Sequence, residues 1–305
     1  MDPSLAAVVA NGRQLLEAAG ASGEAAGRDA VLLARAVLAW DAASWLARSR
    51  EATPPQFPDR FLALIQRRAR HEPIAYITGT REFYGRAFSV NRDVLIPRPE
   101  TEGVVEEALR CLANHPLPDE RRRPVIVDVG TGSGCLAVTL ALEYPSAEIF
   151  ATDTSASALN VARANARHFD VADRIEFRRD AFFAGMSGPI DLVVSNPPYV
   201  RETDRTSLPP EVASFEPPAA LFAGADGLDA IRALLAAAPA RLARGGWLVM
   251  EIGHGQITHV RELIDGNSGL TFHHVRPDLQ GIPRVVVARR SDLPSPVVTS
   301  ETVEH

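Results

Sequence analysis

Residues 1–75 have the apolar spacing that is typical of helices. Leu33, Val37 and Trp40 recur at intervals close to one helical turn, which places them on one helical face. The dipeptide Pro54-Pro55 interrupts the pattern, because proline ends or kinks a helix. The pattern therefore predicts a small bundle of helices at the N-terminus.

Residues 76–123 have a different pattern and form a predicted linker. Residues 83–90 are rich in aromatic side chains and partly alternate apolar with polar positions around Gly85, which predicts a β-hairpin. Pro97 and Pro99 close the hairpin segment. We expect a hairpin followed by a connection that extends to residue 123.

From residue 124 onward, short apolar runs alternate with helical patterns. Strands are predicted at residues 125–129, 149–153, 175–177, 190–195, 247–252, 270–275 and 284–288. Helices are predicted at residues 133–143, after the capping residue Ser155, and at about 228–242. This alternation implies an α/β domain over residues 124–290, with a mostly parallel sheet and helices on both faces. Residues 291–305 are polar and contain two prolines, so we expect a disordered tail.

The composition excludes several reaction classes. All 32 lysine and arginine positions among the 305 residues are arginine, so no lysine can form a Schiff base or bind phosphate as a Walker lysine. Cys111 and Cys135 lack the spacing of metal ligands, and we expect no metal site. The net charge of −6 argues against tight, non-specific nucleic-acid binding. The first residues lack a signal-peptide pattern and no apolar run reaches membrane-spanning length, so we expect a cytoplasmic protein without membrane contact.

A glycine-rich segment, Asp128–Gly134, follows the first predicted strand of the α/β domain. Its residues are Asp128, Val129, Gly130, Thr131, Gly132, Ser133 and Gly134. Glycines let the backbone approach a ligand closely and direct helix N–H groups toward it. An acidic residue followed by G-x-G-x-G fits an S-adenosylmethionine (SAM) site fully. The same segment fits the dinucleotide pattern G-x-G-x-x-G/A more loosely, so this segment alone leaves both ligands open.

Two acidic residues follow the next two predicted strands. Asp153 lies about 20 residues after the glycine-rich segment, where a carboxylate can accept hydrogen bonds from both hydroxyls of a ribose. Asp180 follows the third strand and would reach the same crevice, where it could accept a hydrogen bond from an adenine amino group.

The segment Asn196–Tyr199, which reads Asn-Pro-Pro-Tyr, is the most specific feature of the chain. Pro197 and Pro198 stiffen the backbone and supply no N–H donor. The side-chain oxygen of Asn196 and a proline carbonyl can therefore accept both hydrogens of a planar NH2 group. The ring of Tyr199 can stack on the flat group that carries it.

This arrangement suits the methylation of an amide or an exocyclic amine. An amide nitrogen is a poor nucleophile because its lone pair is delocalised. Two acceptors in a dry pocket raise the electron density on that nitrogen and orient it, which is electrostatic preorganisation. Such a mechanism needs no strong general base, and the sulfonium of SAM supplies the leaving group.

These residues resemble the class I SAM-dependent methyltransferases that modify NH2 groups. The wider pattern resembles the release factor glutamine N5-methyltransferases, the HemK/PrmC family, from about residue 28 to residue 290. The motifs that carry this resemblance, besides the two segments above, lie at 72–79, 81–85, 95–102, 215–217, 223–229 and 251–253.

The resemblance implies a helical N-terminal domain that recognises the substrate, a hairpin linker and a seven-stranded Rossmann-like methyltransferase domain. It implies SAM as cofactor, S-adenosylhomocysteine as product, and as substrate the glutamine of the Gly-Gly-Gln loop in class 1 peptide chain release factors. Residues implied in cofactor binding are Asp128, Gly130, Thr131, Gly132, Ser133, Gly134, Asp153, Asp180, Ala181 and Asn196. Asn196, Pro197, Pro198 and Tyr199 would hold the glutamine amide, and Asn196, Pro197 and Tyr199 would act in catalysis. Many relatives have a tryptophan where this chain has Ala181 followed by Phe182.

Three other functions remain open at this point. The ribosomal protein L3 glutamine methyltransferases are similar, but more often have a Pro-Arg-Ser-Pro linker where this chain has Pro97-Arg98-Pro99-Glu100. An adenine-N6 methyltransferase would share the Asn-Pro-Pro-Tyr segment but needs a basic face or a target-recognition domain. A NAD-dependent oxidoreductase would leave Asn196–Tyr199 unexplained. We expect a monomer that binds release factors and makes no direct contact with nucleic acid.

Overall fold

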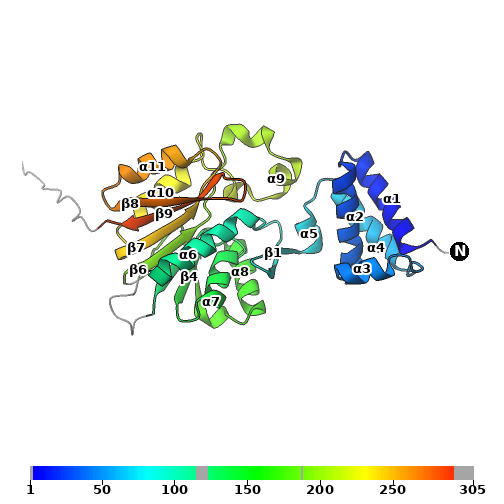
Figure 1. Cartoon of the computed structure of the whole chain (residues 1–305), viewed down its shortest axis with the longest axis horizontal. Coiled ribbons are helices and arrows are strands. Elements are labelled where there is room, and N and C mark those ends of the chain that lie inside the picture. Colours follow the sequence, from blue (N-terminus) through cyan, green and yellow to red (C-terminus); the bar gives the residue numbers. More distant parts are fainter. Residues whose placement is uncertain (1–2, 115–122, 187, 292–305) are drawn as a thin grey trace, which may run out of the picture. The chain divides into compact units, whose positions relative to one another are not determined.

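The computed structural model describes residues 3–114, 123–186 and 188–291. The predicted disorder of the tail therefore lies outside the described residues, apart from Ser291, as does part of the predicted linker. The chain divides into two compact units, a helical unit and an α/β unit (Figure 1).

The helical unit contains the predicted N-terminal bundle. Its helices are α1 (Leu5–Ala18), α2 (Gly23–Leu38), α3 (Ala42–Arg48), α4 (Phe57–Ala69) and α5 (Ile74–Thr78). Ser4, Ser22 and Asp41 cap the first three, because each side chain accepts a hydrogen bond from the first helical turn. Apolar side chains from α1, α2 and α4 form the buried core, which includes Leu16, Leu33, Phe61 and Ile65. In the described part of the chain, no single helix could span a membrane; α2 and α3 together meet the length and composition criterion, but they are bent by 95°.

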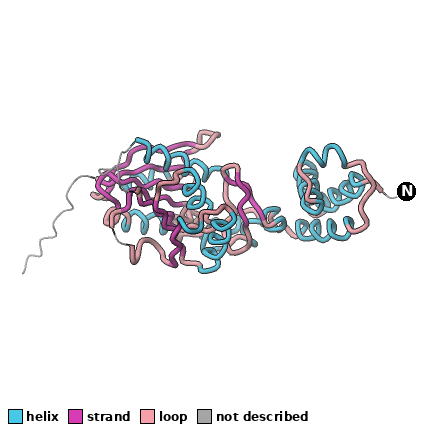
Figure 2. Tube along the Cα trace, turned by 90° about the horizontal axis from the view of Figure 1, so that it is seen from below, coloured by secondary structure: helices cyan, strands magenta, loops and turns pink. Residues whose placement is uncertain are grey.

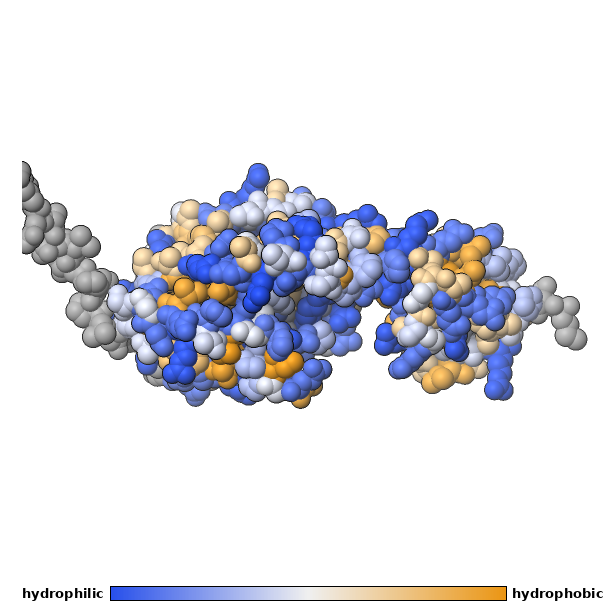
Figure 3. All heavy atoms as spheres, turned by 90° about the horizontal axis from the view of Figure 1, so that it is seen from above, coloured by the Kyte–Doolittle hydropathy of each residue, from blue (hydrophilic) through white to orange (hydrophobic). Residues whose placement is uncertain are grey.

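Two distant segments complete the helical unit. They are Val90–Arg92 and Ser207–Glu216, and the second contains α9 (Pro210–Phe215). Arg68 of α4 joins α9 to the helical bundle. Its Nε donates to Asp29 of α2 at 2.7 Å, and its Nη1 donates to Glu211 of α9 at 2.8 Å. Asp29 is buried, so it depends on this pairing for compensation of its charge. On the face in Figure 3, hydrophobic side chains of this unit are scattered among hydrophilic ones.

The α/β unit contains the predicted seven-stranded sheet, which confirms the fold class. Its strands are β3 (Val125–Val129), β4 (Glu148–Asp153), β5 (Ile175–Arg179), β6 (Ile190–Ser195), β7 (Leu242–Glu251), β8 (Leu270–Pro277) and β9 (Pro283–Arg290). They lie in the order β5-β4-β3-β6-β7-β9-β8. Figure 2 shows the strands of the protein in magenta and the helices in cyan. The first five in this order pair in parallel, and β9 is antiparallel to both of its neighbours.

A separate hairpin of β1 (Thr80–Phe83) and β2 (Arg86–Ser89) agrees with the prediction from the aromatic segment. The turn consists of Tyr84 and Gly85, both with positive φ, as a tight two-residue hairpin turn requires. The backbone N–H of Tyr84 donates to Glu102 at 2.8 Å, which ties the turn to α6 (Glu102–Asn114).

Helices cover both faces of the sheet. On one face α6, α7 (Cys135–Glu143) and α8 (Ala156–His168) pack against residues such as Ile126 and Val194. On the other face α10 (Asp229–Ala237) and α11 (Ile257–Asp265) pack against Val193 and Leu248. Short 3-10 helices lie at Pro99–Thr101, Ala172–Arg174, Glu202–Ser207 and Pro218–Ala220.

Helix α10 is shorter than the predicted helix at 228–242. It ends at Ala237 because Pro239 has no N–H with which to bond the carbonyl of Leu235. The side-chain amide of Asn267 donates to that carbonyl instead, at 2.8 Å. Because the helix has ended, strand β7 can begin at Leu242.

The strand order changes direction between β3 and β6. From β3 the chain proceeds through β4 to β5 on one side, whereas β6 lies on the other side and leads to β7. Ligands of open α/β sheets bind in the crevice at the carboxyl ends of the strands at such a point. The register pairs Val129 with Ser195, so the glycine-rich segment and Asn196 emerge side by side.

Candidate active site

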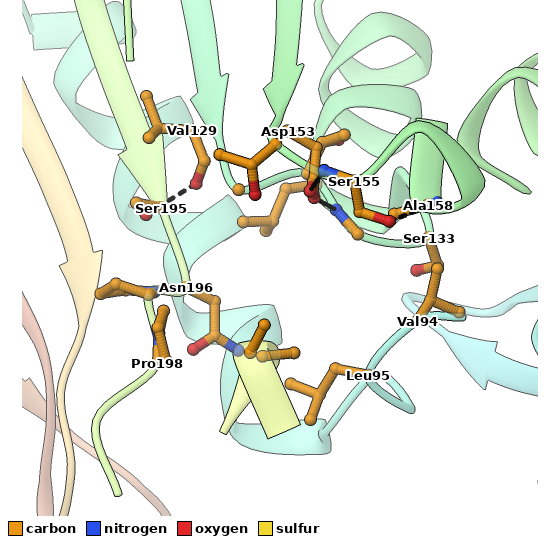
Figure 4. A pocket seen from close by; sticks show the side chains of 18 of the residues that line it. Val94, Leu95, Val129, Ser133, Asp153, Ser155, Ala158, Ser195, Asn196 and Pro198 are labelled. Carbon is orange, nitrogen blue, oxygen red and sulfur yellow. Dashed lines mark hydrogen bonds between the residues drawn. The ribbon is translucent and has the colours of Figure 1, made fainter. Parts of the chain in front are cut away.

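A cavity of about 350 Å³ lies at this switch point, within the size range of about 300–1,000 Å³ for small-molecule sites. Most of the predicted site residues line it: Gly130, Thr131, Gly132, Ser133, Asp153, Asp180, Ala181, Asn196, Pro197 and Pro198. Figure 4 shows Asn196 and Asp153 on different sides of the open space, with Val94 and Leu95 along another. Asp128, Gly134 and Tyr199 are not among the described residues that line the cavity.

The glycine-rich segment forms a tight connection from β3 to α7. Gly130, Gly132 and Gly134 all have positive φ, at 74°, 54° and 81°, which favours glycine at each position. The N–H groups of Gly130 and Thr131 donate to the carbonyl of Thr152 at 2.9 Å. A Cβ at Gly130 or Gly132 would meet no protein atom within 4 Å, so the backbone is open to a ligand there.

Asp128 supports this segment from behind the cavity wall. Its Oδ2 accepts hydrogen bonds from the Thr131 hydroxyl at 2.6 Å and from the Ala137 N–H at 3.2 Å. Burial raises the pKa of Asp128 to about 7. The side chain therefore fixes the loop and the start of α7, and its direct contact with a cofactor stays a prediction.

Gly134 sets the distance between the segment and α8. An added Cβ would lie 3.0 Å from the Cβ of Ala162 and 3.1 Å from its Cα. We expect Gly134→Ala to lower the free energy of unfolding by about 2–4 kcal/mol, from a positive φ and from overpacking. Urea unfolding of the full chain measures this. Gly281→Ala is the matched control, because Gly281 has the same φ of 81° but no neighbour within 4 Å. Equal losses in the two variants would refute the packing explanation.

Asp153 connects the glycine-rich segment to α8. Its Oδ2 accepts from the N–H of Gly132 at 3.0 Å, and its Oδ1 accepts from the N–H of Ser155 at 2.8 Å. Each carboxylate oxygen has a second lone pair, so Asp153 can still accept hydrogen bonds from a ligand with two hydroxyls.

Asp180 and the two residues after it form the neighbouring wall. The Oδ1 of Asp180 accepts from the N–H of Phe182 at 2.8 Å, which shapes the turn after β5. Ala181 and Phe182 both line the cavity. An aromatic ring is therefore present at this wall, supplied by Phe182 rather than by position 181.

Asn196 lies at the end of β6, whose six residues are all buried. The hydroxyl of Ser195 donates to the carbonyl of Val129 at 2.7 Å and holds the strand end against β3. The Nδ2 of Asn196 donates to the Thr101 hydroxyl at 3.0 Å. Its Oδ1 is buried and accepts no hydrogen bond from any described residue. Asn196 thus presents an acceptor oxygen whose hydrogen-bonding capacity is unused.

Tyr199 lies behind this wall, with its hydroxyl donating to Glu251 at 3.1 Å. Its carbonyl accepts from the side-chain amide of Gln256 at 3.1 Å. Gly227 and Gly253 leave room for it, since a Cβ at Gly227 would lie 2.4 Å from that carbonyl and a Cβ at Gly253 would lie 3.0 Å from its Cδ2. The expected stacking of the Tyr199 ring on a substrate stays a prediction.

Sequence reasoning missed two polar residues next to Asn196. Thr101 lines the cavity and donates to Glu251 at 2.5 Å. Burial raises the pKa of Glu251, against the hydrogen bonds from Thr101 and Tyr199. Both residues belong to motifs that carry the family resemblance, at 95–102 and 251–253, but no spacing rule joins these motifs to Asn196.

Burial disfavours the reactive form of the cysteine in the cavity wall. Cys135 lines the cavity, and burial raises the pKa of its thiol to about 12. The thiolate is the reactive form of cysteine, so burial lowers the reactivity of this side chain.

Comparison with known proteins identifies the family. A family model described as the PrmC N-terminal domain matches residues 7–79, and one described as the methyltransferase small domain matches residues 102–209. A release factor glutamine methyltransferase of Cereibacter sphaeroides is 44% identical over 264 residues, which cover 87% of this chain and 91% of that relative. The chain belongs to the release factor glutamine methyltransferase family.

Other members of this family have similar coverage. The relative from Bradyrhizobium diazoefficiens is 39% identical over 88% of this chain and 89% of its own length. The relative from Neisseria gonorrhoeae is 44% identical over 80% of this chain and 86% of its own length. The family resemblance expected from the motifs is therefore confirmed.

Solved structures support the fold. The catalytic domain of hMettl16, in complex with MAT2A 3′UTR hairpin 6, has a TM-score of 0.55 and 15% identity. The match covers 73% of this chain and 82% of that domain. At this identity the likeness shows a shared methyltransferase fold and no shared substrate.

Proposed function

We propose that this enzyme transfers a methyl group from SAM to the side-chain amide nitrogen of the glutamine in the Gly-Gly-Gln loop of class 1 release factors. The names of its relatives support this substrate. The observation that carries the proposal is that Asn196 lines the cavity and that its buried Oδ1 has no partner among the described residues. A free acceptor at this position fits a substrate that brings N–H donors.

The residues of the cavity fit SAM as the cofactor. Asp153 would hold the ribose hydroxyls, the backbone of Gly130–Ser133 would face the amino-acid part, and Asp180 with Phe182 would hold the adenine. Most of the lining surface is apolar, as the adenine ring and the methylene groups require. When bound, SAM supplies an activated methyl group on a sulfonium.

The residues after β6 prepare the substrate amide for reaction. The Oδ1 of Asn196 and the carbonyl of Pro197 accept the two hydrogens of the amide. This pairing raises the electron density on its nitrogen and holds it in one orientation. As the methyl group leaves the sulfonium for the nitrogen, the methylated amide releases one proton to water or to a carbonyl. Because Pro197 and Pro198 have no N–H group, no backbone donor in this stretch competes with the substrate.

The rest of the chain has supporting roles in this proposal. Residues 1–75 recognise the release factor, residues 76–123 connect this part to the catalytic part, and residues 124–290 bind SAM and carry out the transfer. The enzyme acts as a monomer in the cytoplasm and serves translation termination without direct contact with nucleic acid.

Mass spectrometry tests the proposal. Purified full-length enzyme is incubated with SAM and a class 1 release factor, and the peptide that contains Gly-Gly-Gln is fragmented. We expect one added methyl group on the glutamine side chain and formation of S-adenosylhomocysteine. A release factor in which this glutamine is replaced by glutamate is the control and should stay unmodified. An unmodified glutamine in the natural factor would refute the proposal.

A further inference from the structure

Three polar side chains form a hydrogen-bonded chain behind the acceptor oxygen of Asn196. The Nδ2 of Asn196 donates to the Oγ1 of Thr101 at 3.0 Å, and this hydroxyl donates to the Oε2 of Glu251 at 2.5 Å. Thr101 is 95 residues from Asn196 and 150 residues from Glu251 in the sequence. These consecutive hydrogen bonds therefore form only in the folded α/β unit.

These consecutive hydrogen bonds are buried, and their donors and acceptors can be assigned in one direction, from Asn196 through Thr101 to Glu251. Glu251 and Thr101 are each 1% exposed, so water cannot replace either partner. Both oxygens of Glu251 are occupied, since Oε1 accepts from the Tyr199 hydroxyl. The Thr101 hydroxyl donates its single proton to the Oε2 of Glu251, so this proton is not available to Asn196. The oxygen of Thr101 then remains as an acceptor for Asn196.

The direction of these hydrogen bonds determines which end of the Asn196 amide faces Thr101 and which end is left for a substrate. An acceptor at Thr101 requires the NH2 end of Asn196 on that side, which places the unpartnered Oδ1 at the opposite end of the amide. A flipped amide would place two acceptor oxygens against each other at Thr101. It would also present N–H donors to a substrate that brings N–H donors of its own.

We propose that Glu251, acting through the hydroxyl of Thr101, orients the amide of Asn196 so that it presents an acceptor to the substrate amide. Thr101 and Glu251 are positioning residues for the methyl transfer, and this role rests on the proposed function. Asn196 supplies the contact with the substrate, whereas the buried carboxylate of Glu251 determines which end of the Asn196 amide makes that contact.

Variants of Thr101 test the proposal through the rate. Thr101→Val keeps the shape of the side chain and removes the hydroxyl, and Thr101→Ser keeps the hydroxyl. We expect Thr101→Val to lower kcat on the release factor by about 10²-fold, because a misplaced contact at the reacting group costs about that much. Thr101→Ser should recover most of this loss. The affinity for SAM, measured by calorimetry, should change by less than about threefold in both variants, well below 1.4 kcal/mol.

Thr139→Val is the matched control. Thr139 is buried on α7, its hydroxyl has no hydrogen-bond partner among the described residues, and it does not line the cavity. This variant makes the same chemical change at a residue that does not take part in the hydrogen bonds between Asn196, Thr101 and Glu251. It should keep the wild-type kcat. Equal losses in Thr101→Val and Thr101→Ser, or a loss of SAM affinity parallel to the loss in kcat, would overturn the proposal.

Variants of Glu251 test the origin of the orientation. Glu251→Gln can still accept from Thr101 through its amide oxygen, whereas Glu251→Leu has a similar size and no acceptor. We expect a loss in kcat for Glu251→Leu like that for Thr101→Val, and a much smaller loss for Glu251→Gln. Because Thr101 and Glu251 belong to the same series of hydrogen bonds, adding Thr101→Val to Glu251→Leu should cause little further loss in kcat. Fully additive losses would contradict the proposed coupling.

A measurement without substrate separates this proposal from the proposed function. Full-length enzyme is labelled with ¹⁵N-asparagine, and the side-chain signal of Asn196 is assigned by its absence in Asn196→Ala. We expect this NH2 signal to be protected from exchange in the wild type and in Thr101→Ser, and to lose protection in Thr101→Val and Glu251→Leu. An unchanged signal in the last two variants would overturn the orienting role. If the wild type fails to methylate the release factor but shows this pattern, the proposed function fails, whereas the orientation of the Asn196 amide by Thr101 and Glu251 stands.

Discussion

Replacing Asn196 with alanine is expected to lower the rate of methyl transfer by about 10²–10³-fold, the loss typical of removing one preorganised hydrogen-bond partner. The Oδ1 of Asn196 is buried at the cavity wall without a partner among the described residues, so a substrate amide would meet it fully desolvated. The other residues proposed to hold SAM follow β3, β4 and β5. The affinity for SAM should therefore fall only modestly.

Single-turnover kinetics with excess enzyme measure the first effect, and calorimetry with SAM measures the second. Asn160→Ala is a suitable control, because Asn160 is exposed on α8. It should keep the wild-type rate. If Asn196→Ala retains more than a tenth of the rate, or loses SAM binding to the same extent, Asn196 is not the group that activates the amide.

Replacing Asp153 with alanine is expected to weaken SAM binding by at least about 10²-fold. Its carboxylate accepts hydrogen bonds from Gly132 at 3.0 Å and Ser155 at 2.8 Å, so it orders two loops of the cavity. Its remaining lone pairs can also accept the ribose hydroxyls. Hydrogen bonds to charged groups contribute about 1.5–3 kcal/mol each, and every 1.4 kcal/mol is a factor of ten in affinity.

Calorimetric titration with SAM and with S-adenosylhomocysteine measures this loss. Both ligands should be affected equally, because they share the ribose. Asp173→Ala, at an exposed position after α8, is the control and should bind as the wild type does. Affinity in Asp153→Ala within a few-fold of the wild-type value would remove Asp153 from the cofactor site.

Local pattern in the sequence predicted the parts of the site that lie on one continuous stretch. Asp128–Gly134 begins with the last two residues of a buried strand, so its place at the carboxyl edge of the sheet follows from strand direction. The same reasoning places Asp153, Asp180 and Asn196 at that edge. Parallel pairing then brings these strand ends together, as the register of Val129 with Ser195 shows.

The sequence could not predict contacts that depend on tertiary packing. Thr101 meets Asn196 and Glu251 across 95 and 150 residues, and neither distance is fixed by a helical or strand period. Tyr199 follows Asn196 closely, yet its hydroxyl turns to Glu251, because Gly227 and Gly253 leave space for it behind the wall. Such choices depend on which side chains fill the surrounding volume.

The segment after Tyr199 also lacks a pattern that predicts its fold. Residues 207–216 contain α9 and belong to the helical unit, where Glu211 pairs with Arg68. The segment is short and has proline at 209 and 210, so its apolar spacing covers less than two helical turns. An ion pair across 143 residues holds it, and ion pairs leave no periodic signal in a sequence.

A direct competition between acceptors tests the proposed reaction most sharply. One reaction contains the full-length enzyme, SAM, a class 1 release factor, ribosomal protein L3 and an adenine-containing oligonucleotide in equal amounts, and mass spectrometry follows the methyl group. We predict methylation of the glutamine in the Gly-Gly-Gln loop, with L3 and the oligonucleotide unmodified while the release factor is consumed. Methylated L3 or methylated adenine beside an unmodified release factor would contradict the proposed function.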